Sequence, residues 1–81
     1  MSDDAALIQG IVVIFRKCWD LPRHITDDDL KDYAALVLKR IKAGESETAL
    51  FMEVAKIQLK LGQPRNESYK EVAALTVETV D

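Results

Sequence analysis

Hydrophobic positions recur at helical spacing over four stretches of the chain. At about 100° per residue, the apolar side chains between Ala49 and Leu61 cover roughly 220° of a helical wheel. A surface helix of a small monomer needs an apolar stripe of only about 100°. This stretch is therefore predicted to be the centre of an all-α fold, a compact bundle of three to four short helices. The predicted helices span residues 3–19, 27–43, 47–61 and 67–80.

Capping and stop signals lie at the ends of these stretches. The expected helix starts are marked by Thr26, Ser46 and Asn66, and the expected stops by Pro22, Gly44 and Gly62. Three aspartates follow Thr26, and basic residues end the same stretch, which suits the helix dipole. The β-branched run at 76–80 has poor helix propensity, so its two alternatives are a fraying helix end and a short strand.

Some apolar residues have no place on the inward faces of this bundle. The other helices can cover Leu50, Val54, Ile57 and Leu61, whereas Met52 and Leu59 remain on the far edge. Other helices also carry apolar residues outside their inward faces, and the third carries a polar residue within its apolar arc. Together these positions predict a partner or homodimer interface, made of Val13, Trp19, Leu36, Met52, Gln58 and Leu59. Trp19 fits a core lid equally well. Gln58 either pairs across an interface or marks the edge of the apolar face.

Length, charge and cysteine content restrict the class of protein. The 81 residues predict one domain over 1–81, of a size that is often oligomeric. The acidic start lacks the basic region of a signal peptide, and the apolar run at 7–15 is too short for a bilayer. A single cysteine fits a reducing compartment. We therefore expect a cytoplasmic protein that does not interact with a membrane.

No pattern of residues predicts catalysis or metal binding. Cys18 belongs to an apolar helix face, and His24 lies beyond Pro22, so the two do not form an obvious nucleophile and base. The run at 27–29 lacks the alternating spacing of a calcium loop. We expect no enzyme activity, no cofactor and no metal site.

The basic residues suggest an alternative. Lysines and arginines on the second and third predicted helices could contact DNA, as in a helix-turn-helix regulator, through Lys39, Arg40, Lys42, Lys56, Lys60 and Arg65. However, the start of the third helix, where a recognition helix offers polar side chains, reads Thr48-Ala49-Leu50-Phe51-Met52. The net charge of −3 also disfavours nucleic acid as a partner.

The spacings Leu30…Val37…Ile41…Gly44, Leu50…Val54…Leu61 and Tyr69…Leu75 resemble those of small enterobacterial regulators of the AriR/YmgB type. That resemblance implies a short all-helical protein that forms dimers or connects other regulators, in biofilm and acid-stress signalling. Because the resemblance consists only of the spacing of hydrophobic residues, it assigns no functional residue of that family to this chain. The predicted function is that of a small bacterial or phage-type regulatory or inhibitory protein, without enzyme activity, that binds another protein through an apolar helical surface.

Overall fold

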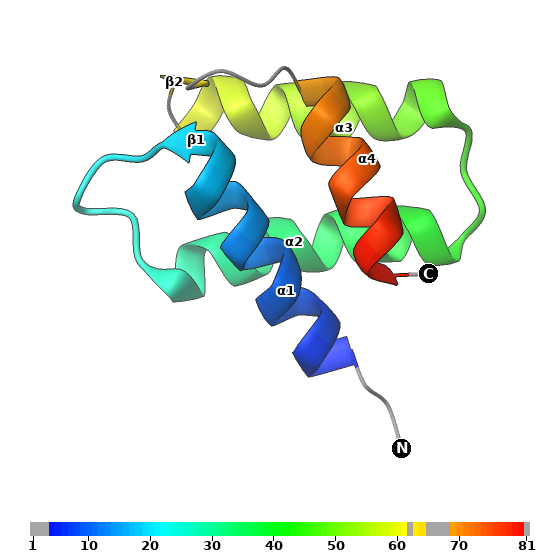
Figure 1. Cartoon of the computed structure of the whole chain (residues 1–81), viewed down its shortest axis with the longest axis horizontal. Helices are drawn as coiled ribbons and strands as arrows, with labels where there is room; N and C mark the ends of the chain where they lie inside the picture. The colour runs from blue at the N-terminus through cyan, green and yellow to red at the C-terminus, as the bar shows by residue number, and fades with distance from the viewer. Residues whose placement is uncertain (1–3, 62, 65–68, 81) are drawn as a thin grey trace.

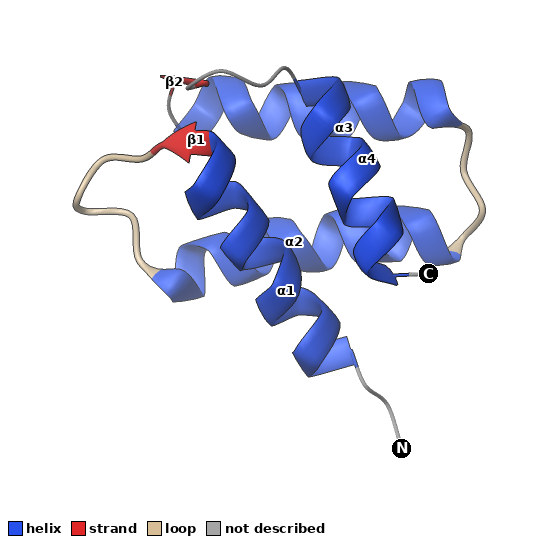
Figure 2. Ribbon diagram, in the orientation of Figure 1, coloured by secondary structure: helices blue, strands red, loops and turns tan. Residues whose placement is uncertain are grey.

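Four helices and one very short strand pair make up the structure, a computed structural model that describes residues 4–61, 63–64 and 69–80. The helices are α1 (Asp4–Cys18), α2 (Asp27–Lys42), α3 (Glu47–Leu61) and α4 (Tyr69–Val80). The strands β1 (Trp19–Asp20) and β2 (Gln63–Pro64) pair antiparallel, with Trp19 opposite Pro64 (Figure 2). The all-α fold class predicted from the sequence is confirmed.

The helices form two layers. α2 and α3 run antiparallel beside one another, and α1 and α4 cross over the same side of that pair (Figure 1). The shortest extent of 16 Å fits a molecule two helices thick. α1 and α4 approach closely at Gly10, where an added Cβ would lie 3.0 Å from Cγ2 of Thr79.

The helix starts and stops follow the local signals. The backbone N–H of Asp29 donates to Oγ1 of Thr26 at 3.2 Å, and the Thr26 N–H donates to the Asp29 carboxylate at 3.1 Å, which completes a capping box. Ser46 accepts from the Ala49 N–H at 3.2 Å, and Gly44 has a left-handed φ of 72°. Asn66 and Gly62 lie outside the described residues.

One helix end differs from the prediction, and another decides between the two alternatives for residues 76–80. The predicted first helix includes Trp19, but α1 ends at Cys18 and Trp19 belongs to β1. Because Pro22 disfavours helical geometry at Leu21, the chain turns extended and its backbone pairs with β2. At the other end, residues 76–80 are helical. The hydroxyls of Thr76 and Thr79 donate to the carbonyls one turn earlier, at 2.7 and 2.9 Å, and are satisfied within α4.

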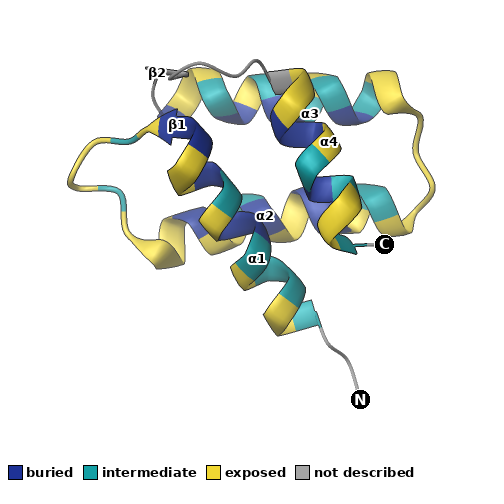
Figure 3. Ribbon diagram, in the orientation of Figure 1, coloured by how far each residue is buried: buried dark blue, intermediate teal, exposed yellow. Residues whose placement is uncertain are grey.

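The core lies between the two layers (Figure 3). α3 buries Leu50, Val54, Ile57 and Leu61, as its pattern predicts. Every helix contributes to the cluster, whose other members are Ile11, Val12, Phe15, Cys18, Trp19, Leu30, Ala34, Val37, Leu38, Val72 and Ala73. None of the described helices combines the length and the apolar character needed to cross a membrane.

Candidate protein-interaction face

Four large hydrophobic side chains are exposed in the described part of the chain, and all four were singled out from the sequence. The exposed fractions are 46% for Leu36, 56% for Val13, 58% for Met52 and 85% for Leu59. Met52 and Leu59 are seven residues apart on α3, so they share its outward side. Leu36 is on α2, the neighbour of α3 in the same layer. Val13 is on α1, in the other layer.

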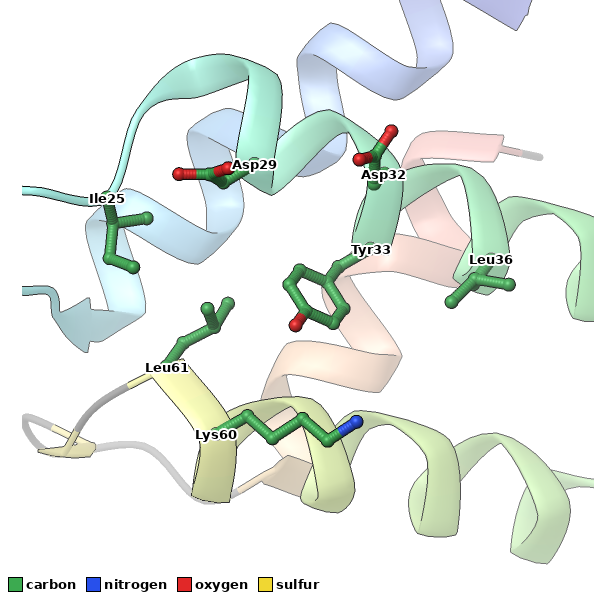
Figure 4. A pocket seen from close by; sticks show the side chains of 7 residues that line it. All are labelled: Ile25, Asp29, Asp32, Tyr33, Leu36, Lys60 and Leu61. Carbon is green, nitrogen blue, oxygen red and sulfur yellow. The ribbon is translucent and has the colours of Figure 1, made fainter.

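A cleft of about 510 Å³ lies between α2 and α3 (Figure 4). The Tyr33 ring projects from α2 toward α3, and Leu36 lies one turn further along α2. The α2 wall carries the carboxylates of Asp29 and Asp32, and the α3 wall carries the ammonium group of Lys60. The cleft therefore combines apolar side chains, among them Leu36 and Leu61, with acidic residues on the α2 side and a basic residue on the α3 side.

Two smaller hollows continue this cleft along the helices. One of about 250 Å³ includes Leu36 and Arg40, and one of about 130 Å³ includes Arg40, Met52 and Lys56. These two hollows share Arg40, and the first of them shares Leu36 with the cleft. We use the name α2–α3 face for this surface, made of Asp29, Asp32, Tyr33, Leu36, Met52, Lys56, Leu59 and Lys60.

Arg40 joins α2 to α3 near the end of the α2–α3 face that lies away from Tyr33 and Lys60. Its Nε donates to Oε1 of Glu53 at 2.8 Å, and its Nη1 donates to Oε1 of Glu45 at 2.7 Å. The hydrogen bond and charge of Glu45, followed by those of Glu53, raise the pKa of Arg40 above its usual value. Arg40 therefore stays charged at all ordinary pH values and fixes the level at which α2 lies against α3.

These ion pairs also change the electrostatics of the basic residues considered for DNA binding. Arg40 is neutralised by two carboxylates, and Lys42 pairs with Asp4 of α1. Lys39, Lys56 and Lys60 are exposed, whereas Arg65 lies outside the described residues. The described lysines and arginines of α2 and α3 are thus interrupted by carboxylates rather than gathered into one cationic stripe.

Trp19 and Gln58 belong to the packing of the chain itself. Trp19 is 1% exposed, and its ring stacks on Phe15 with the centroids 4.7 Å apart. Its Nε1–H donates to Oε1 of Gln58 at 3.0 Å. Of the two interpretations of Trp19, the structure shows the core lid in place of the surface anchor. The Gln58 amide has an acceptor role inside the chain, because an indole N–H enclosed in the core needs a partner.

The residues considered for catalysis or metal binding lie apart or have structural roles. Cys18 is buried in the core, and His24 is exposed in the loop before α2. Asp27 pairs with Arg16 at 2.6 Å, and Asp29 belongs to the capping box. Within the described ranges, no group of three His, Cys, Asp or Glu side chains is placed to hold a metal ion.

Sequence reasoning named the exposed apolar residues of this face, but it gave no role to Asp32 and considered Lys60 only in the DNA-binding alternative. The signal available was the α2 spacing Asp29, Asp32, Tyr33 and Leu36, which puts these four on one side of a helix. Its relation to Lys60 depends on how α2 and α3 pack.

Comparison with known proteins adds no relative. No protein-family model, curated protein or solved structure matches the chain. The resemblance to the AriR/YmgB type stays a prediction from hydrophobic spacing.

Proposed function

We propose that this chain is a small cytoplasmic regulatory or inhibitory protein without enzyme activity, of bacterial or phage type, that acts by binding another protein through the α2–α3 face. A homodimer built on the same apolar surface is part of this proposal. The observation that carries it is the exposure of Met52 and Leu59 on the outward side of α3, together with that of Leu36 on the neighbouring α2.

The arrangement around these residues supports a protein partner over a small ligand. The cleft shares Leu36 with one smaller hollow, which shares Arg40 with the other, and both apolar and charged side chains line these hollows. An apolar centre with a polar rim is the usual anatomy of a protein–protein interface. Single exposed apolar residues are common on protein surfaces, but residues that share one seam form a patch that a partner can cover.

A capture experiment with matched variants tests the proposal. Tagged wild-type protein is mixed with lysate of the cell of origin, alongside a Met52→Glu/Leu59→Glu double variant and an Ala6→Glu control. Ala6 is an exposed residue of α1, so the control introduces a glutamate away from the α2–α3 face, with one negative charge where the double variant adds two. We expect the same defined protein to be retained by the wild type and by the control, and lost with the double variant.

Equal retention by all three proteins would place binding elsewhere and refute the proposal. Circular dichroism must first show that the double variant is as helical as the wild type. Since Met52 and Leu59 are more than half exposed, we expect both substitutions to leave the fold intact.

A further inference from the structure

The two walls of the α2–α3 face carry opposite charge at the same end of the molecule. Asp29 and Asp32 line the α2 wall, and Lys60 lines the α3 wall, with Lys56 one turn further along. In the part of the chain that the structure describes, neither Asp32 nor Lys60 takes part in an ion pair. Both charges are exposed at the rim of an apolar cleft.

The levels of the two helices are fixed by contacts. Arg40 is hydrogen-bonded to Glu53, and Tyr33 lies across the cleft from Lys60. Tyr33 lies seven residues before Arg40 on α2, and Lys60 lies seven residues after Glu53 on α3. Because the two helices are antiparallel, these steps run in the same direction, and Asp32, next to Tyr33, lies at about the same height along the helix pair as Lys60. Leu36 belongs to the same α2–α3 face, and its height along the helix pair falls between those of Met52 and Leu59.

The geometry points to a second copy of this chain as the occupant of the α2–α3 face, in an isologous dimer that packs α2 of each copy on α3 of the other. This inference rests on the proposed function, because it uses the same binding surface. The two-fold axis runs parallel to α2 and α3, and a half-turn about it places the α2–α3 face of one copy on the α2–α3 face of the other. Each residue then meets residues at its own level on the opposite helix of the second copy.

Charge complementarity is the reason to prefer a second copy over an unrelated helix. In this arrangement Asp32 of each copy faces Lys60 of the other, so the dimer contains two equivalent pairs of opposite charge. Leu36 of each copy lies along the exposed Met52 and Leu59 edge of the other, which removes these apolar side chains from water. The face is thus complementary to itself in both charge and apolar pattern.

Charge reversal tests this pairing with purified protein alone. Sedimentation velocity over a range of concentrations gives the dimer dissociation constant at low ionic strength. We expect Asp32→Lys and Lys60→Glu to raise it by about tenfold or more each, because each variant places like charges opposite one another at both equivalent contacts. The matched controls are Glu71→Lys on α4 and Lys17→Glu on α1, which make the same charge changes in the other layer and should leave the constant unchanged.

Mixing the two face variants gives the decisive measurement. In a mixed dimer the introduced lysine faces the introduced glutamate, and the remaining contact is the native pair. We therefore expect an equimolar mixture of Asp32→Lys and Lys60→Glu to recover the dimer, as should the double variant Asp32→Lys/Lys60→Glu by itself.

Three results would overturn the inference: a wild-type monomer at all concentrations up to about the millimolar range, single variants that dimerise like the wild type, or impaired variants that do not recover when mixed. A monomer that still retains a partner dependent on Met52 and Leu59 would refute the dimer, and with it the homodimer part of the proposed function, and would leave standing only the binding of a different protein to the α2–α3 face.

Discussion

The hydrogen bond between Trp19 and Gln58 should contribute measurably to stability. Gln58→Met removes the acceptor and keeps a similar length and helix propensity. The Nε1–H of Trp19, which is 1% exposed, then loses its partner at 3.0 Å. A buried donor left without an acceptor costs about 1–3 kcal/mol. For an 81-residue domain the expected total stability is about 4–12 kcal/mol, so the variant should still fold but unfold earlier.

Urea unfolding followed by far-UV circular dichroism measures this cost, at one fixed protein concentration because self-association shifts apparent stability. In thermal unfolding, each kcal/mol should lower Tm by about 4–8 °C. Lys31→Met, an exposed position on α2 outside the α2–α3 face, is the control and should stay within about 0.5 kcal/mol of the wild type.

A double-mutant cycle with Trp19→Phe isolates the hydrogen bond from the change in packing. Phenylalanine has no N–H, so Gln58→Met should cost little in that background, and the coupling free energy should be about 1 kcal/mol or more. An equal cost of Gln58→Met with and without the indole N–H would show that the hydrogen bond does not stabilise the fold, and would refute the reasoning.

Three further predictions concern the core, a cap and the thiol. Val54→Ala should destabilise the fold by about 1–3 kcal/mol through the cavity it leaves, whereas Lys56→Ala in the same helix should be nearly neutral in the same urea titration. Thr26→Ala should cost about 0.5–2 kcal/mol, because it removes the side-chain acceptor of the capping box; an unchanged midpoint would mean that water replaces the cap without loss. Cys18 should react with a chromogenic disulfide reagent far more slowly in the native protein than in urea, and rapid native labelling would contradict its burial.

The helix bounds could be predicted because the signals that set them are local. Thr26, Ser46 and Gly44 act on backbone groups within a few residues, and the observed starts at Asp27 and Glu47 agree with the prediction. The buried stripe of α3 was predictable for a similar reason, since its period fixes which side chains share a face. The exposure of Met52 and Leu59 follows from the same pattern.

Contacts that join distant segments could not be predicted from the pattern. A two-residue strand has no period, so the pairing of Trp19 with Pro64 leaves no trace in the sequence. The acceptor of Trp19 is Gln58, 39 residues away, and only the tertiary fold brings β1 and α3 together. The opposite walls of the cleft likewise depend on the level at which Arg40 and Glu53 fix α2 against α3.

The close crossing of α1 and α4 has a consequence for folding during synthesis. The apolar face of α1 is synthesised before the other three helices, and α2 can pack on it soon afterwards, but its remaining cover is α4, which is synthesised after α2 and α3. Until then a nascent chain presents Ile11, Val12 and Phe15 incompletely covered, a state open to chaperones and to aggregation. A transcript or protease cut that ends the chain after α3 would therefore yield a fragment with an open core, so cellular abundance of this protein should depend on the integrity of α4.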